Sequence, residues 1–338
     1  MLLLFFGSPS FSQTNSQAWL EFPTDNHALF TKNPEAFYMY VNRDFEGKKS
    51  QPWQGGSYGL VRGPQRGSAG IYYRAFHEGI DIKPLHRDRN GVPLDKVCAA
   101  ANGRVVHASA DPTKSNYGRY IVIEHRREGC PYYTLYAHLA SVQVKVGQQV
   151  KQGTPIGVLG YSGRGLDRAR AHLHFEFCLK FNSHFPAWHD MYGQGRNDHG
   201  EFNGRNLFGM NPADLLRAVY KNPDLSISQF ITSSQKPMFE LTVNESPDFE
   251  LIRNYPWLVR DGEVASPAAW SITFSEQLIP MRARAESQRV GEPRVRWVGT
   301  APQALSQLSR GLVTGSRSAP RLTDSGKRFA HLLTFPSH

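Results

Sequence analysis

Four side chains at two places in the sequence could hold and use a metal ion. His172 and His174 stand two residues apart in a run that alternates with apolar residues, as in a half-buried β-strand, so both imidazoles should project from one face. Upstream, His77 and Asp81 are four residues apart, and Gly79 between them allows a sharp bend. Three histidine or carboxylate ligands with a fourth position left for water are typical of a catalytic zinc site. The pattern therefore indicates a metallohydrolase.

The elements that must position these side chains are predicted to be mainly β-strands. Short β-type runs punctuated by Gly, Asn and Pro favour an all-β sandwich or barrel over parallel βαβ units. The strands predicted around the candidate site are 96–100, 103–108, 119–125 and 132–139. Later in the chain, 238–243 and 269–274 also resemble strands, and 211–220 resembles a short helix with Asn211 as its N-cap.

Length and composition describe a globular protein of more than one unit. A chain of 338 residues is too long for one ordinary core, and 40% hydrophobic with 20% charged residues is typical of a folded protein. No run approaches the roughly 18 apolar residues of a membrane span, so we expect no transmembrane anchor. The net charge of +10 favours anionic partners such as cell-wall polymers, nucleic acid or membrane surfaces.

The cysteines leave histidine and carboxylate as the only plausible metal ligands. There are three, Cys98, Cys130 and Cys178, and an odd number excludes a complete disulfide framework. None forms a Cys-x-x-Cys pair, and Cys98 and Cys178 lie in apolar runs where a buried free thiol is expected.

The first residues suggest export. Residues 1–12 combine an apolar start with small residues that fit a cleavage site, although a basic segment and most of the usual apolar stretch are missing. We interpret 1–12 as a truncated signal peptide and expect a periplasmic or extracellular protein. An apolar chain end without targeting function is the alternative.

Six motifs occur in one order and together resemble peptidase family M23, the zinc endopeptidases of LytM and lysostaphin type that cut peptidoglycan cross-links. The resemblance covers residues 66–180 and implies an antiparallel β-sandwich-like peptidase core. The motifs are His77-x-Gly79-x-Asp81, 101–106, 117–125, 133–139, 146–157 and 172–176.

The resemblance implies a role for each of five residues. His77, Asp81 and His174 would hold one zinc ion per chain, while His138 and His172 would stand beside it as catalytic residues without binding it. Bound zinc polarises the scissile carbonyl and lowers the pKa of water, and imidazoles can then move the proton and stabilise the developing oxyanion. Which of the two histidines is the base stays open.

Two kinds of neighbouring residue adjoin these five in the sequence. In family members a tyrosine shortly before the first ligand assists the oxyanion; Tyr72 and Tyr73 are both candidates, and the spacing does not choose between them. Glu78 and Glu176 adjoin ligands, and strand alternation should turn both away from the metal, so we expect a supporting or structural role for them.

The predicted walls of the site are a turn and a long loop. The turn 163–170 carries three arginines. They would bind a substrate carboxylate or be solvated surface charges, and the sequence favours neither alternative. The segment 181–210 is rich in Gly, Asn and His, and we expect it to be a surface loop that partly covers the metal site.

The sequence thus predicts four regions: a leader at 1–12, an N-terminal extension at 13–65, a peptidase domain at 66–221 and a C-terminal module at 222–338. The module should be small and α+β; from residue 281 onward it has ten Lys and Arg against three Asp and Glu. The predicted function is zinc-dependent cleavage of peptidoglycan peptides, with peptidoglycan as the partner. The alternatives are an M23-like regulator of wall hydrolases and a nucleic-acid-binding protein; an exported protein is not expected to bind nucleic acid.

Overall fold

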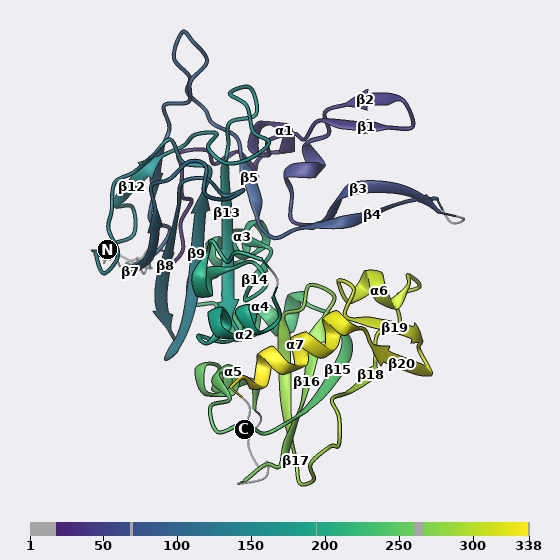
Figure 1. The fold of residues 1–338 in the computed structure, drawn as a ribbon. Helices are drawn as coiled ribbons and strands as arrows, with labels where there is room; N and C mark the ends of the chain where they lie inside the picture. The colour runs from purple at the N-terminus through teal and green to yellow at the C-terminus, as the bar shows by residue number, and fades with distance from the viewer. Residues whose placement is uncertain (1–17, 68–69, 194, 260–265, 337–338) are drawn as a thin grey trace, which may run out of the picture.

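The computed structural model describes residues 18–67, 70–193, 195–259 and 266–336, so the predicted leader at 1–12 lies outside the described residues. Within that part, every pair of named strands is antiparallel, which confirms the predicted mainly β fold (Figure 1).

The largest sheet carries the candidate site. Its strands run in the order β11-β7-β8-β9-β13-β14, with β5 pairing the first half of β13. The predicted strands 103–108, 119–125 and 132–139 are present here as β7, β8 and β9, and the predicted strand 96–100 is β6 (Lys96–Cys98) of a second sheet. The strands of this sheet are β5 (Ile80–Ile82), β7 (Gly103–Ser109), β8 (Tyr120–Arg127), β9 (Cys130–Ala137), β11 (Gln149–Val150), β13 (Leu173–Lys180) and β14 (Leu207–Met210).

β13 lies inside this sheet, paired with β9 on one edge and with β5 and β14 on the other, and both of its faces are covered. Leu173, Phe175 and Phe177 alternate along it and are fully buried in the main hydrophobic core. Their odd positions leave His174 and Glu176 on the other face, where they are buried among polar groups. Alternation thus gives one strand an apolar side for the core and a polar side for chemistry.

A second, smaller sheet packs on the same core. It has the order β10-β12-β6, and its residues Val97 and Ile156 are buried with Ile121 and Phe175 of the large sheet. The two sheets together make the sandwich-like arrangement expected of the peptidase core. Its strands are β6 (Lys96–Cys98), β10 (Ser141–Val142) and β12 (Pro155–Val158).

Two hairpins extend from the same side of the large sheet (Figure 1). One pairs β1 (Arg43–Phe45) with β2 (Lys48–Ser50), and the other pairs β3 (Gly59–Gly67) with β4 (Gly70–His77). The predicted boundary between residues 65 and 66 falls inside β3, so the extension and the peptidase core share a hairpin. The short helices before and between these strands are η1 (Ala28–Phe30), α1 (Pro34–Phe37) and η2 (Trp53–Gly56).

The prediction of one surface loop over 181–210 is wrong. The segment contains α2 (Phe185–Met191), η3 (Gly200–Phe202) and β14, which extends the large sheet beside β13. Phe185 and Trp188 of α2 are buried against Leu332 near the end of the chain, so distant residues fix a segment whose composition suggested a loop.

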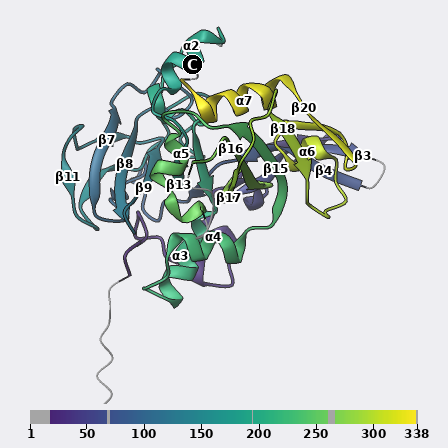
Figure 2. The ribbon, with the colours of Figure 1, turned by 90° about the horizontal axis from the view of Figure 1, so that it is seen from below.

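The C-terminal part is α+β, as predicted. Its four-stranded sheet has the order β17-β16-β15-β18, and α7 lies over that sheet in both views (Figures 1 and 2). The predicted strands 238–243 and 269–274 are β15 and β16. The strands of the four-stranded sheet are β15 (Pro237–Asn244), β16 (Ala269–Ser275), β17 (Pro280–Glu286) and β18 (Arg294–Trp297). A separate two-stranded sheet pairs β19 (Val313–Ser316) with β20 (Ala319–Leu322).

The helix predicted at 211–220 is α3 (Pro212–Lys221), and the side chain of Asn211 caps it by accepting from the main-chain N–H of Ala213. The remaining helices are α4 (Ile227–Ser234), α5 (Glu250–Asn254), η4 (Pro256–Leu258), α6 (Leu305–Leu308) and α7 (Asp324–Thr334).

Two predicted absences concern cysteines and membranes. Cys98, Cys130 and Cys178 are all free; Cys178 is buried as expected, whereas Cys98 is only half-buried. Among the described helices, none combines the length and apolar character needed to cross a membrane.

Candidate metal centre

His77, Asp81 and His174 converge on one point. His77 ends β4, Asp81 is the middle residue of β5, and His174 lies on β13; all three are buried. Asp81 Oδ1 is 3.0 Å from His77 Nε2 and 3.1 Å from His174 Nδ1, and these two nitrogens are 3.1 Å apart. Two imidazole nitrogens and one carboxylate oxygen so close together form a donor set that could hold a metal ion such as zinc.

The sheet itself brings these ligands together. Asp81 and His174 are directly paired across β5 and β13, so their side chains project on the same face. The turn from His77 into β5 passes tightly against β13, because a Cβ on Gly79 would lie 2.4 Å from the carbonyl oxygen of Phe175. Glycine is required there for that close approach.

His138 and His172 lie beside this group. His172 Nε2 is 3.3 Å from Asp81 Oδ1, and the ring centre of His138 lies 4.8 Å from that of His172 and 5.8 Å from that of His174. His138 follows β9 with a φ of +64°, a left-handed conformation that turns the chain out of the strand. The structure thus gathers all five residues singled out from the sequence.

Main-chain carbonyls orient both of these histidines. His138 Nδ1 lies 2.9 Å from the carbonyl oxygen of Ser162, and His172 Nδ1 lies 2.7 Å from that of Arg170. A carbonyl only accepts, so each Nδ1 carries the proton, and Nε2 of a neutral ring keeps its lone pair. Burial, and then the neighbouring His172 and His174, hold the pKa of His138 well below its usual value. His138 is therefore neutral near pH 7 and able to accept a proton.

The charges of the metal-free ligands are coupled. Burial alone would raise the pKa of Asp81, but the neighbouring His172, His77 and Arg62 hold it well below its usual value. Burial alone would lower the pKa of His174, but hydrogen bonds to Asp81 and Glu176 raise it to about 9. A carboxylate ionised in this position is ready to bind a cation.

The expectation that Glu176 points away from the site is wrong. Its Oε1 is 2.8 Å from His174 Nε2, because residues 174 and 176 share one face of β13. Alternation applied correctly to the sequence would have found this contact. Tyr117, which the sequence analysis missed, donates to the same oxygen of Glu176 over 2.8 Å and stacks on His174 with ring centres 5.7 Å apart.

Neither tyrosine considered for the oxyanion is aimed at the ligands. The hydroxyl of Tyr72 hydrogen-bonds the side-chain amide of Gln65 on the exposed hairpin, and that of Tyr73 accepts from Arg43 over 3.1 Å. Glu78 does point away, as expected, and pairs with Arg310 of the C-terminal part over 2.7 Å. The side chain that does reach the ligands from this hairpin is Arg62, which sequence reasoning also missed.

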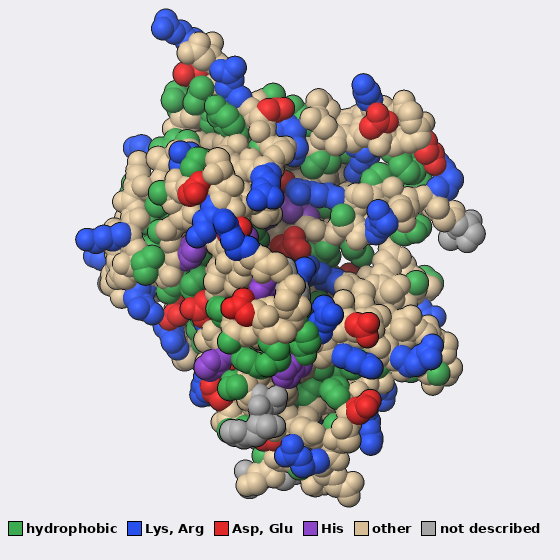
Figure 3. Space-filling view, viewed as in Figure 1, with side chains coloured by type: hydrophobic (Ala, Val, Ile, Leu, Met, Phe, Trp, Pro, Cys, Tyr) green, Lys and Arg blue, Asp and Glu red, His purple; other side chains and the backbone are tan. Residues whose placement is uncertain are grey.

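The surroundings of the site differ in part from those predicted. In the turn 163–170, the carbonyl oxygens of Arg168 and Ala169 accept from Arg87, while Arg170 Nε donates to the carbonyl of Tyr40. From the segment predicted as a lid, His199 contacts Tyr117 with ring centres 5.2 Å apart. Tyr117 in turn donates to Glu176, so the segment 181–210 contacts the site through Tyr117. Figure 3 shows histidine and acidic side chains in a hollow beside the β3–β4 hairpin, with basic side chains around it.

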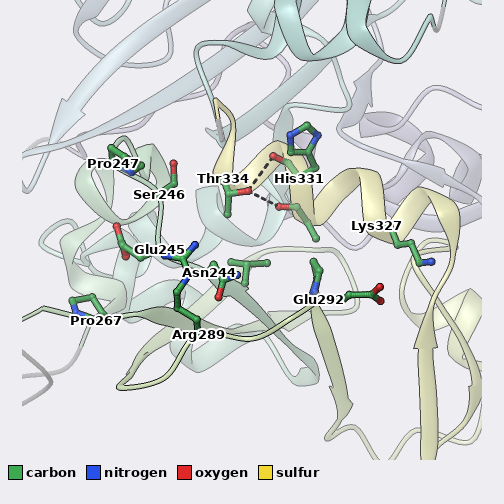
Figure 4. Close-up of a pocket in the computed structure, with 13 residues that line it drawn as sticks. Asn244, Glu245, Ser246, Pro247, Pro267, Arg289, Glu292, Lys327, His331 and Thr334 are labelled. Atoms are coloured by element: carbon green, nitrogen blue, oxygen red, sulfur yellow. Dashed lines mark hydrogen bonds between the residues drawn. The ribbon is translucent and has the colours of Figure 1, made fainter. Parts of the chain in front are cut away.

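A separate cavity of about 830 Å³ lies in the C-terminal part, between the end of β15 and α7 (Figure 4). Its lining mixes both charges, with Glu245 and Glu292 against Arg289 and Lys327. None of the five clustered site residues lines it.

Comparison with known proteins agrees with the geometry of the site. Residues 75–185 match the family model "Peptidase family M23", and this range contains all five site residues. The chain carries an M23 domain.

The M23 region is also similar to curated proteins. An uncharacterized metalloprotease of Haemophilus influenzae is 36% identical over 103 residues, which are 30% of this chain and 18% of that protein. Peptidoglycan DD-endopeptidase ShyC of Vibrio cholerae is 44% identical over 104 residues, 30% of this chain and 20% of that protein. Murein hydrolase activator NlpD of Escherichia coli is 34% identical over 110 residues, 32% of this chain and 25% of that protein. The matches thus span a quarter or less of each of these relatives.

Solved structures of similar proteins include a zinc containing peptidase from Vibrio cholerae, 25% identical with a TM-score of 0.29 over 48% of this chain and 36% of that one. The catalytic domain of lysostaphin from Staphylococcus simulans is 22% identical with a TM-score of 0.29, over 48% of this chain and 89% of that one.

Proposed function

We propose that this protein is a zinc-dependent endopeptidase that hydrolyses cross-link or stem peptides of bacterial peptidoglycan. The observation that carries the proposal is the convergence of His77, Asp81 and His174, with two further histidines beside them. The similarity of the M23 region to a peptidoglycan DD-endopeptidase supports the choice of substrate. An exported protein with a peptidase domain at 66–221 is part of the same proposal; the N-terminal half of β3 belongs to that domain as well.

In this proposal His77 Nε2, Asp81 Oδ1 and His174 Nδ1 hold the zinc. When bound, zinc supplies a Lewis acid that polarises the scissile carbonyl and allows water to act as a nucleophile near neutral pH. Of the two remaining histidines, one takes the proton as the water oxygen bonds to the carbonyl carbon. A histidine then returns a proton to the amide nitrogen as the C–N bond breaks, so that a carboxylate and an amine leave.

The test is digestion of purified sacculi by the purified protein, followed by analysis of the released fragments. We expect cross-link-cleaved peptides that disappear with a chelator and return when zinc is added. His174→Ala and Asp81→Ala should lose zinc and activity together, because two remaining ligands bind zinc poorly. His138→Ala and His172→Ala should keep zinc and lose activity by about 10²–10⁴-fold, as for a general acid–base group.

Two results would contradict these assignments separately. Intact sacculi at every zinc concentration, with the metal bound, would refute the endopeptidase function. Loss of zinc from His138→Ala would instead show that His138 is a ligand and that the roles are misassigned.

A regulator of wall hydrolases is the second candidate, favoured by the similarity to the murein hydrolase activator NlpD. It predicts that the protein alone leaves sacculi intact but raises the rate at which an added murein hydrolase cleaves them. His138→Ala and His172→Ala would then keep the full effect, whereas the endopeptidase proposal requires both histidines.

A further inference from the structure

Arg62 is aimed at the metal ligands by an irregularity in β3. Leu60 pairs with Phe76 and Arg62 pairs with Ala75, so Val61 is an extra residue, a β-bulge, between them. Without the bulge, residue 61 would oppose Ala75 and Arg62 would point to the opposite face. With it, Arg62 lies on the same face as Ala75 and hence as His77, two residues further along β4.

The guanidinium of Arg62 is fixed by two contacts. Nη2 donates to Asp81 Oδ2 over 2.5 Å, and Nε donates to the carbonyl oxygen of Gly55 over 2.8 Å. These contacts occupy the oxygen of Asp81 that faces away from the histidines and leave Oδ1 for the metal. The Arg62 side chain is 34% exposed while that of Asp81 is 1% exposed, so the arginine is the member of the pair that a substrate can reach.

Neither Tyr72 nor Tyr73 of the β3–β4 hairpin occupies the position of Arg62 beside the ligands. Tyr72 lies on the face opposite to His77, because it is an odd number of residues away along the strand. Tyr73 lies on the face of His77 but four residues away, roughly 13 Å along the strand at about 3.3 Å per residue. Its hydroxyl is also engaged by Arg43. Arg62 is therefore the hairpin's donor closest to the ligand group.

We propose that Arg62 is a catalytic residue that stabilises the oxyanion of the scissile carbonyl. Nη2 holds Asp81, and we assign the N–H groups of Nη1 to the substrate carbonyl. A preorganised cation beside a carbonyl on which negative charge develops lowers the barrier more than it strengthens ground-state binding. This assignment rests on the proposed endopeptidase function and adds to it a second positive charge, the Arg62 guanidinium, that polarises the substrate carbonyl.

The test compares Arg62→Gln and Arg62→Lys with the matched control Arg66→Gln. Arg66 lies on the same strand and is also ion-paired, to Glu46, but its side chain is 58% exposed near the hairpin tip. On a defined cross-linked peptide, we expect Arg62→Gln to lower kcat by about 10²–10³-fold, as for loss of one oxyanion donor, with a much smaller change in KM. Arg62→Lys should recover part of kcat, and Arg66→Gln should match the wild type.

Two readouts do not depend on turnover. Affinity for a phosphinic pseudopeptide, whose tetrahedral group carries the charge of the transition state, should fall in Arg62→Gln by a factor similar to the fall in kcat. The visible spectrum of the Co²⁺-loaded protein should change in Arg62→Gln, because Asp81 Oδ2 is released, and stay unchanged in Arg66→Gln.

Wild-type kcat and wild-type phosphinate affinity in zinc-loaded Arg62→Gln would overturn the proposal. So would loss of zinc from that variant at saturating zinc, because Arg62 would then act only by supporting a ligand. If the wild type binds metal but cleaves nothing, the endopeptidase function fails. The phosphinate affinity and the Co²⁺ spectrum then still decide whether Arg62 faces a tetrahedral anion at this site.

Discussion

Each candidate ligand uses one polar atom for the metal site and one for the surrounding protein. His77 Nδ1 contacts a main-chain carbonyl while its Nε2 faces the site. His174 Nε2 contacts Glu176 while its Nδ1 faces the site. Asp81 divides its two oxygens in the same way, between the site and Arg62. At the scale of single residues, these outer contacts decide which atoms face one another.

Glu176→Gln should weaken zinc binding by about 10–100-fold, the usual cost of losing a polar partner behind a ligand histidine. The carboxylate accepts the Nε2 proton of His174, which fixes the tautomer and leaves the Nδ1 lone pair for the metal. A neutral amide accepts this proton less strongly and can also turn its NH₂ group toward the ring. Competition for zinc against a chelator of known affinity measures the effect.

The matched control is Glu78→Gln, because Glu78 also adjoins a ligand in sequence but pairs with Arg310. Its zinc affinity should equal that of the wild type. Equal affinities for both variants and the wild type would show that Glu176 does not orient His174.

At the scale of elements, the central strands β8 and β9 enclose a histidine that makes folding sensitive to acid. His125 Nδ1 lies 2.8 Å from the carbonyl oxygen of Asn102, and Nε2 lies 2.7 Å from the hydroxyl of Thr134 on β9. Burial lowers the pKa of His125 to about 4. The strand pair therefore holds this ring in its neutral form.

The free energy of unfolding should fall as the pH falls from about 6.5, the pKa of histidine in an unfolded chain, to about 4. In this window the unfolded chain binds a proton at His125 that the folded protein does not bind, so acid favours unfolding. The loss from this one residue is on the order of 3 kcal/mol once the pH is below both values.

Urea unfolding of the wild type and of His125→Gln across this pH range measures the effect. The pKa of His107 is also lowered to about 4, so the difference between the two proteins isolates His125. The variant should show a shallower dependence on pH. Parallel curves for the two proteins would mean that His125 titrates normally in the folded state.

At the scale of the whole molecule, one hydrophobic core runs from the peptidase region into the C-terminal part. Phe181 and Phe208 of the peptidase region pack against Phe329 of α7 with ring centres 5.4 and 5.7 Å away, and Phe274 of β16 joins them at 5.5 Å from Phe329. All four rings are buried. The C-terminal part therefore covers apolar surface that the peptidase region would otherwise expose to water.

Phe329→Ala should lower the stability of the whole chain by about 3–5 kcal/mol, the usual cost of removing a buried aromatic ring. Because the core is shared, thermal unfolding should stay a single transition at a lower Tm, and zinc release should follow the same curve. Lys327→Ala, an exposed position on the same helix, is the control and should change Tm little. Two separate transitions, with zinc release unaffected by Phe329→Ala, would show that the two parts fold independently.

Local patterns in the sequence were sufficient for several features of this protein. The alternation that marks β13, the position of Asn211 before α3 and the spacing of His77, Asp81, His172 and His174 all depend on residues close together in the chain. Backbone geometry converts such spacing directly into faces of a strand or ends of a helix. The mainly β core could therefore be anticipated from these patterns, whereas the gathering of all five site residues was implied by the resemblance to peptidase family M23.

Only the tertiary structure decided which other groups meet the site. Arg62 faces Asp81 because of one extra residue in β3, and the sequence carries no signal that places a bulge there. The segment 181–210 is ordered by contacts with β13 and with residues near 332, and Glu78 is paired by Arg310 more than two hundred residues away. Such contacts depend on how distant elements pack. Packing is set by the shape and volume of the whole core, which the short-range alternation of residue types does not encode.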